Sequence, residues 1–286
     1  MPERHDAAYL IGHCIILLPM KTIKELLDLK GKTAIVTGGA VGIGYGISYR
    51  LAEAGANVVI ADKTPSEGEH AAKELSDKGF SATAVATDVS DENAVKRMVE
   101  ETVKKYGTID ILVNNAGIFP PIPVMQMSLK DFDNVLSVNL KGVFLCTKYV
   151  AEHMISKNHG GKIINITSID ALHPSSIGLA HYDASKHGVW GFTKNSALEL
   201  APHKIWVNAI APGGIITPGV QKLQQSMQMP SGVDMKKVLD AMVAKIPMKK
   251  LGDPDDIGTV ALFLASDMSS YMTCSQIVVD GGVLLA

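Results

Sequence analysis

Short apolar runs alternate with helical patterns along most of the chain. Runs rich in Val and Ile occupy residues 33–38, 58–62, 81–89, 109–117, 161–168, 204–213 and 276–282. Helical patterns lie between them, for example over residues 46–55 and 92–107. The runs are continuously apolar rather than alternating, as expected of parallel strands that helices cover on both faces. The pattern therefore predicts an α/β fold, with a doubly wound parallel sheet in three layers, α/β/α.

Two segments fall outside this rhythm. No linker interrupts residues 30–286, which we expect to form a single domain, and residues 1–29 precede it as an N-terminal extension. Its apolar run, residues 9–18, is too short to span a bilayer, and no signal-peptide cleavage site follows. Residues 1–19 either lie outside the core domain, with Met20 as a start, or form an apolar arm against a neighbouring subunit. The Met-rich segment at about 215–254 follows a strand end, so we expect a lid over a substrate rather than helix-core filler.

Composition removes several classes of protein. The 286 residues are 47% hydrophobic, which is enough to bury a core. Lys and Arg number 27 against 29 Asp and Glu, and this balance gives no hint of a nucleic-acid partner. The 3 cysteines form no CxxC or Cys/His cluster, so we expect neither a disulfide framework nor a metal site. Without a run long enough to enter a membrane, the expected location is the reducing cytoplasm.

A glycine-rich turn follows the first apolar run. The sequence TGGAVGIG, residues 37–44, joins that run directly to a helical pattern. Glycines at such a turn let the backbone approach a pyrophosphate, whose negative charge then faces the N-terminus of the helix. The turn predicts a dinucleotide site in a Rossmann-type fold, the alternative being a tight structural turn. The residues expected to contact the cofactor there are Gly38, Val41, Gly42, Ile43 and Gly44.

The identity of the dinucleotide depends on the end of the next strand. Asp62 lies eighteen residues beyond Gly44. A carboxylate there can accept hydrogen bonds from both ribose hydroxyls of NAD, and it would repel the 2′-phosphate of NADP. Lys63 argues the other way, because its ammonium could pair with that phosphate. No Arg or Lys lies within the glycine turn, so we expect NAD, with NADP less favoured.

Tyr182 and Lys186 are four residues apart in a helical pattern, so their side chains share one face. An unperturbed tyrosine has a pKa of about 10, too high for a good base near neutral pH. A neighbouring ammonium favours the phenolate and lowers that pKa. Tyr182 could then take a proton from an alcohol, or return it to a ketone, while a hydride moves to or from the nicotinamide.

Ser168 ends an apolar run, at the edge of the sheet where a substrate should bind. Its hydroxyl can hydrogen-bond the reacting oxygen and orient it. Thr167 is the adjacent candidate, but the alternation of side chains along a strand points it to the opposite face.

The turn T-G-x-x-x-G-x-G resembles that of the short-chain dehydrogenases/reductases, and later motifs agree over about residues 30–286. Those motifs are Asp88 with Val89, the NNAG of residues 114–117, the Y-x-x-x-K of Tyr182 and Lys186, the Pro212–Gly213 turn and the DGG of residues 280–282. The resemblance implies a homotetramer, often built on the helix of Tyr182 and the C-terminal strand. It also implies cofactor contacts by Asp88, Val89, Asn115, Ala116, Gly117, Tyr182, Lys186, Pro212, Gly213, Ile215 and Thr217.

The resemblance further implies a catalytic set of Asn139, Ser168, Tyr182 and Lys186. The matching asparagine in the family helps to hold a water that links the lysine to solvent. The separation of fourteen residues between Ser168 and Tyr182 is one more than is frequent in the family, so the loop between them carries an extra residue.

The substrate is expected to be a small molecule. Polar residues near Ser168 and Tyr182, namely Asp170, His173 and His181, are candidates to contact a sugar or polyol hydroxyl, or else are solvated loop residues. We therefore expect an NAD-dependent oxidoreductase that interconverts a secondary alcohol (a sugar, polyol or cyclic alcohol) and a ketone. The alternatives are an NADPH-dependent 3-oxoacyl thioester reductase and, from another class, a non-catalytic dinucleotide-binding sensor.

Overall fold

The computed structural model describes residues 10–11, 14–15, 20–217, 240–241 and 243–286. Its largest sheet contains seven parallel strands in the order β5-β4-β3-β6-β7-β8-β9. They are β3 Thr33–Thr37, β4 Asn57–Asp62, β5 Ala82–Ala86, β6 Ile111–Asn114, β7 Gly161–Ile166, β8 Ile205–Pro212 and β9 Gln276–Val279. The order reverses between β3 and β6, which is where ligands bind in open α/β sheets.

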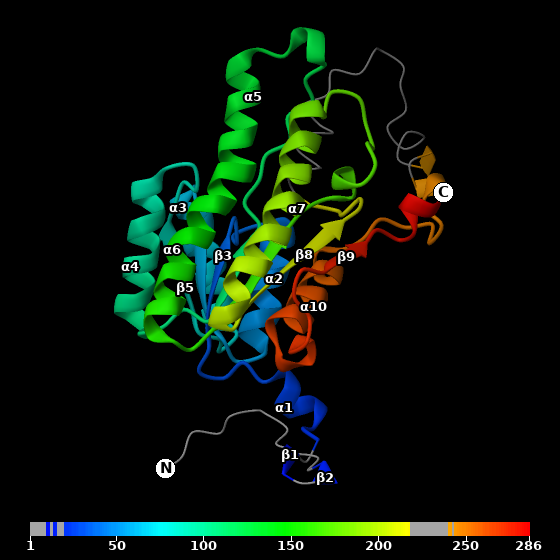
Figure 1. Cartoon of the computed structure of the whole chain (residues 1–286). Coiled ribbons are helices and arrows are strands. Elements are labelled where there is room, and N and C mark those ends of the chain that lie inside the picture. The colour runs from blue at the N-terminus through cyan, green and yellow to red at the C-terminus, as the bar shows by residue number, and fades with distance from the viewer. Residues whose placement is uncertain (1–9, 12–13, 16–19, 218–239, 242) are drawn as a thin grey trace.

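Helices cover both faces of this sheet (Figure 1). One face packs against α2 Gly42–Glu53, α3 Pro65–Asp77 and α10 Pro254–Ala265, and the other against α4 Glu92–Tyr106, α6 Gly142–Lys157 and α7 Ala180–Leu200. Neighbouring residues of β3 divide between the two cores, because Ile35 faces the second and Val36 faces the first. The predicted doubly wound, three-layer α/β fold is confirmed.

Two further features border the carboxyl edge of the sheet. Helix α5, Leu129–Leu136, continues through a π-helical stretch, Ser137–Lys141, into α6. The start of α7 lies at the same edge (Figure 1). Short 3-10 turns occupy Val124–Gln126, Ile169–Ala171, Ala201–His203, Asp267–Ser269 and Val283–Leu285.

The described part of the N-terminal extension lies at the opposite end of the molecule (Figure 1). Two short strands, β1 Leu10–Ile11 and β2 Cys14–Ile15, pair antiparallel. Helix α1, Ile23–Leu27, begins with a capping box formed by Thr22 and Glu25. Lys21 donates from Nζ to Oδ2 of Asp267 at 2.7 Å, and Leu29 is buried in the first core, so the residues before 30 contact the sheet domain. The role predicted for residues 1–19 falls almost wholly outside the described residues.

Two expectations from the sequence need correction. Strand β5 is half-buried because it lies at the edge of the sheet, whereas the run 81–89 predicted a longer strand covered on both faces. The helical pattern around Asn139 contains the π-helical stretch rather than an uninterrupted α-helix. Most of the predicted lid, residues 218–239 and 242, lies outside the described residues. No helix in the described part of the chain is long and apolar enough to cross a membrane.

Candidate active site

The glycine turn takes the conformation that its sequence predicts. Gly38 and Gly42 have φ of 59° and 55°, in the left-handed region that favours glycine. A Cβ atom on Gly44 would lie 1.9 Å from the carbonyl oxygen of Gly38, so the helix meets the turn too closely for any side chain. Val41 is the N-cap residue of α2, and its side chain accepts no hydrogen bond from the first backbone N–H groups of the helix. These are the features that a pyrophosphate group requires.

Residues at the end of β6 fasten the turn to the sheet. Asn115 donates from Nδ2 to the carbonyl oxygens of Thr37 and Gly38, both at 2.9 Å. The Thr37 hydroxyl accepts from the backbone N–H groups of Asn115 and Ala116, at 3.0 and 3.1 Å. The sequence placed Asn115 and Ala116 near a cofactor but gave Thr37 no role. The structure makes Thr37 the link between the two central strands.

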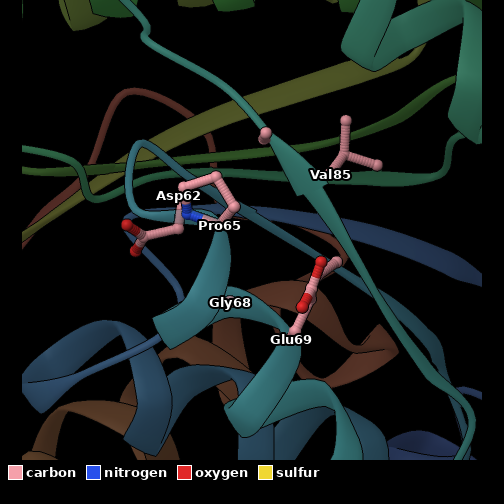
Figure 2. A pocket seen from close by; sticks show the side chains of 7 residues that line it. Asp62, Pro65, Gly68, Glu69 and Val85 are labelled. Atoms are coloured by element: carbon pink, nitrogen blue, oxygen red, sulfur yellow. The ribbon is translucent and has the colours of Figure 1, made fainter.

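Asp62 lies at the carboxyl end of β4, beside the turn. Its Oδ2 accepts from the backbone N–H of Ala40 at 3.3 Å, and its Oδ1 accepts from that of Thr64 at 3.0 Å. Asp62 also lines a pocket between α3 and β5 together with Glu69, and Figure 2 shows the two carboxylates on either side of Pro65. A negatively charged group in this region would therefore meet two carboxylates.

Lys63 is held by a carboxylate. Its Nζ lies 2.7 Å from Oδ2 of Asp88, the residue that follows β5 by two positions. Burial raises the pKa of Asp88, but this ion pair and hydrogen bonds from Ser90 outweigh it and lower the pKa to about 2. The neighbouring Val89 is buried against Gly142 of α6. A Cβ atom on Gly142 would lie 2.8 Å from the Val89 side chain, so this contact requires glycine.

The opposite wall of the site comes from the end of β8. The N–H of Gly213 donates to the carbonyl of Val279 at 2.9 Å, and a Cβ atom on Gly213 would lie 2.8 Å from Asp280. Ile215 is buried and forms a parallel bridge with Gly252, which joins the two ends of the segment predicted to be a lid. Thr217 is half-buried and is the last described residue before 240.

Tyr182 and Lys186 lie on the first turns of α7, as the spacing predicts. Lys186 is buried and donates from Nζ to the carbonyl of Ile166, the last residue of β7, at 2.7 Å. Burial lowers its pKa to about 8. The same Nζ lies 5.6 Å from the centre of the Tyr182 ring.

The pKa of Tyr182 differs from the sequence expectation. Burial raises it above its ordinary value, a hydrogen bond with Ser168 lowers it, and the charges of Asp170 and Asp183 raise it. Lys186 directs its ammonium at Ile166 rather than at the phenol oxygen, which explains why it does not offset these effects here. Lys186 is therefore not among the groups that lower the pKa of Tyr182 in this arrangement, and its expected effect stays a prediction. A positive charge arriving in the site would favour the phenolate.

Asn139 is fully buried in the π-helical stretch and makes three hydrogen bonds. It accepts from the N–H of Ile118 at 2.8 Å, and it donates to the carbonyl of Ile118 at 2.9 Å and to the hydroxyl of Ser185 at 3.0 Å. A Cβ atom on Gly117 would lie 3.4 Å from Oδ1 of Asn139 and 3.7 Å from Nζ of Lys186. The Asn139 and Lys186 side chains therefore both lie beside Gly117. Single turns of π-helix occur often at functional sites.

Ser168 and Thr167 face different ways. The Thr167 hydroxyl donates to the carbonyl of Ile210 in β8 at 2.9 Å, whereas the Ser168 hydroxyl lies near Tyr182 and contacts Asp170. Ser168 also donates to Oδ2 of Asp170 at 2.7 Å. Asp170 is buried, and its Oδ1 accepts from the N–H of Ser175 at 2.9 Å.

The other polar candidates have different surroundings. His173 is exposed on the loop after β7. His181 is fully buried, and neither of its ring nitrogens has a hydrogen-bond partner among the described residues. Asp183 is half-buried, and burial followed by the charge of Asp170 raises its pKa. The structure therefore brings Asp170 to Ser168 and Tyr182, while the contacts predicted for His173 and His181 stay predictions.

Sequence reasoning missed two residues that shape this site. Ser185 accepts from Asn139 and donates to the carbonyl of Tyr182 at 2.6 Å, so it joins the π-helical stretch to α7. Its position inside Y-x-x-x-K was the available signal. Phe119 packs edge-on against the Tyr182 ring, with ring centres 5.9 Å apart, and no spacing pattern indicated it.

This fold and site belong to a known family. A family model described as enoyl-(acyl carrier protein) reductase matches residues 38–284. A relative named 3-oxoacyl-[acyl-carrier-protein] reductase FabG, from Thermotoga maritima, is 39% identical over 259 residues, which are 91% of this chain and 100% of the relative. The chain belongs to the short-chain dehydrogenases/reductases, and it is an oxidoreductase of that family.

Solved structures agree with this assignment. A short-chain type dehydrogenase/reductase from Mycobacterium marinum is 35% identical with a TM-score of 0.85, over 93% of this chain and 100% of that one. A gluconate 5-dehydrogenase from Burkholderia cenocepacia, solved with NADP and tartrate, is 33% identical with a TM-score of 0.83, over 93% and 100% of the two chains. The relatives thus include proteins named for different substrates.

Proposed function

We propose that this protein interconverts a secondary alcohol and a ketone, with a nicotinamide dinucleotide as the hydride carrier and Tyr182 as the general acid and base. The observation that carries the proposal is the meeting of Ser168, Tyr182 and Lys186 at the carboxyl edge of the sheet, beside the glycine turn. Intact Tyr182 and Lys186 favour turnover over a non-catalytic sensor.

The residues divide the work of one proton transfer. Ser168 orients the reacting oxygen by a hydrogen bond, and Tyr182 removes the alcohol proton or returns it to the ketone. The dinucleotide supplies the hydride acceptor and, when oxidised, a positive charge that favours the Tyr182 phenolate. Lys186 and Asn139 meet beside Gly117, so a water held between them would connect the site to solvent.

We propose NAD as the preferred dinucleotide. Support comes from the carboxylates of Asp62 and Glu69 and from the ion pair that engages Lys63 with Asp88. The NADP in the Burkholderia cenocepacia structure favours the other choice. The residues of the glycine turn would hold the pyrophosphate of either dinucleotide, and Asp62 would bind the adenosine ribose of NAD.

Two substrate classes remain candidates. The buried carboxylate of Asp170 beside Ser168 favours a polar substrate that can donate hydrogen bonds, such as a sugar or polyol. The similarity to a 3-oxoacyl-[acyl-carrier-protein] reductase favours reduction of a 3-oxoacyl thioester. We propose the polar alcohol because Asp170 touches the reacting site.

Titration with NADH and NADPH, beside an Asp62→Ala variant, tests the cofactor. We expect NADH to bind more tightly and the variant to lose that preference. Tighter binding of NADPH would make the thioester reductase the better proposal. Binding of neither would overturn the role of the glycine turn. A panel of sugars, cyclic alcohols and acetoacetyl thioesters then tests the substrate, and turnover of the thioesters alone would exclude the alcohol proposal.

We also propose that the protein acts as a homotetramer in the cytoplasm. Apolar side chains remain exposed on two long helices, among them Phe144 on α6 and Leu198 on α7, with 45% and 76% of their surface accessible. Phe144 contacts Phe192 of α7, with ring centres 6.3 Å apart, and contiguous exposed apolar surface is typical of association surfaces. The involvement of α7 agrees with the family resemblance.

A further inference from the structure

The proton of the Ser168 hydroxyl is already engaged in this structure. It is donated to Oδ2 of Asp170 at 2.7 Å, and the backbone N–H of Asp170 donates back to Ser168 Oγ at 3.1 Å. The two residues are 5% and 6% exposed. A hydroxyl has one proton to donate. While Ser168 donates to Asp170, it cannot also donate to the oxygen of a substrate.

Asp170 is a strong competitor for that proton. A hydrogen bond to an ionised carboxylate is about twice as strong as one between neutral groups, so a ketone oxygen is the weaker acceptor. Asp170 is also fixed in place, because its Oδ1 accepts from the N–H of Ser175 at 2.9 Å and its backbone belongs to the 3-10 turn Ile169–Ala171. Ser168 is released only when another donor satisfies the carboxylate.

We propose that Asp170 makes the site selective for substrates with a hydroxyl group on the carbon next to the reacting one, that is, vicinal diols and α-hydroxy ketones. This inference rests on the alcohol–ketone function proposed above. The neighbouring hydroxyl donates to Asp170 in place of Ser168, and Ser168 then donates to the reacting oxygen. The oxygens of a gauche vicinal diol lie about as far apart as two hydrogen-bonded oxygens, so one substrate can reach both groups.

The same arrangement rejects other groups at that carbon. A simple ketone offers no donor and leaves Ser168 bound to Asp170. A carboxylate at that position would meet the negative charges of Asp170 and of the half-buried Asp183 nearby. Asp170 is therefore a specificity-determining residue, and the donor that it selects is a neutral hydroxyl.

Matched substrate pairs test this selectivity on the full-length enzyme. We compare oxidation of 2,3-butanediol with that of 2-butanol, and reduction of acetoin with that of butanone. For wild type, kcat/KM should favour the hydroxylated member of each pair by about tenfold or more, as a hydrogen bond to a charged group provides. In Asp170→Asn that ratio should fall towards one. The ratio within each pair, and not the absolute rate of either substrate, is the readout, because Asp170 also contacts Ser168 and its charge acts on Tyr182.

Asp183→Asn is the matched control. It also removes a negative charge beside Tyr182, but no hydrogen bond joins Asp183 to Ser168 among the described residues. The preference for the hydroxylated substrates should persist in this variant. Thermal unfolding with cofactor present gives a second readout, in which 2,3-butanediol raises the Tm of wild type more than 2-butanol does, and Asp170→Asn loses the difference.

The outcomes separate the inference from the function on which it rests. Equal kcat/KM within each pair for wild type, or an equal loss for both members in Asp170→Asn, would overturn the role of Asp170 and leave the alcohol–ketone function standing. Turnover restricted to acetoacetyl thioesters would overturn the polar-alcohol substrate and the role of Asp170 together, whereas no turnover of any alcohol or ketone would overturn the alcohol–ketone function itself.

Discussion

At the scale of single residues, the site depends on which partners its charged groups contact. Asp88 engages Lys63, Asp170 engages Ser168, and Lys186 donates to a backbone carbonyl. Each of these contacts changes what the residue can do for a ligand. Tyr182 is the clearest case, because burial raises its pKa and the charges of Asp170 and Asp183 raise it further.

Removing one of these carboxylates should change the pH dependence of catalysis. Asp183→Asn takes away a charge that raises the pKa of Tyr182, so the phenolate forms at lower pH. The rising limb of kcat/KM for alcohol oxidation should move to lower pH, by up to about one unit. Initial rates between pH 6 and 10 measure it, with the exposed Asp133→Asn as control. A shift to higher pH would contradict the electrostatic account.

Lys162 should lower the stability of the fold at neutral pH. It is buried at the start of β7, against the Trp206 ring at 4.4 Å, and burial lowers its pKa to about 8. Between pH 8 and the ordinary lysine pKa, the unfolded chain binds more protons than the folded one, so stability rises with pH. Lys162→Met should raise the free energy of unfolding by about 1 kcal/mol at pH 7, less at pH 10.

Chemical unfolding at several pH values measures this difference between Lys162→Met and wild type. Lys104→Met, which removes an exposed lysine of α4, is the control. An advantage of the variant that grows with pH would show that Lys162 is not destabilised by burial.

At the scale of elements, the close approach of α2 and α10 fixes where the glycine turn lies. A Cβ atom on Gly46 would be 2.6 Å from the carbonyl oxygen of Pro254, and one on Gly258 would be 2.6 Å from that of Gly46. Neither carbonyl can move without moving its helix. The helix that begins at the glycine turn is therefore positioned by backbone contact with a helix two hundred residues away in the chain.

A pair of identical substitutions tests this contact. Gly46→Ala should destabilise the protein by about 1–3 kcal/mol, because the added methyl group meets backbone. Gly191→Ala, in α7 with nothing within 4 Å of the added atom, should stabilise it by about 0.5–1 kcal/mol through helix propensity. Thermal unfolding of both variants measures the effects, and a loss of equal size in both would refute the packing argument.

The sequence predicted the helices, strands and turns better than it predicted the contacts between segments that are distant in the chain. The positions of the strands along the chain, the glycine turn and the shared face of Tyr182 and Lys186 follow from local spacing, and the structure has all three. The strands end earlier than the apolar runs 81–89 and 109–117 predicted. The π-helical stretch around Asn139 was not predictable, because its hydrogen bonds to Ile118 and Ser185 join segments distant in sequence. The ion pair of Lys63 and the bond between Ser168 and Asp170 depend in the same way on how loops pack.

At the scale of the whole molecule, the proposed dinucleotide site and the proposed association surface lie in different places. The candidate site lies along the carboxyl edge of the sheet, and the described N-terminal residues lie at the opposite end (Figure 1). The exposed apolar residues of α6 and α7 lie on the outer layer instead. Phe144 and Phe192 contact each other across these two helices, with ring centres 6.3 Å apart. Association through this layer would leave the dinucleotide region accessible.

The proposed homotetramer predicts the mass of the assembly in solution and a substitution that should lower it. Sedimentation should give four times the chain mass of 30.4 kDa. Leu198→Asp should reduce that mass to a dimer or monomer, because a buried unpaired carboxylate is strongly unfavourable in an apolar interface. Ile23→Asp, at an exposed position on α1, is the control and should leave the mass unchanged. A monomeric wild type would exclude the tetramer.

The strand order also determines which half of the seven-stranded sheet can form first during synthesis. The ribosome delivers β3, β4 and β5 first, and these adjacent strands already carry the glycine turn and Asp62. Gly213 receives its backbone partner only when β9 arrives, near the end of translation. A nascent chain that stops before residue 276 would present β8 as an open edge, the kind of edge that invites aggregation. Such a chain would already carry the residues proposed to bind adenosine, but it would lack the strand that completes the sheet beside Gly213.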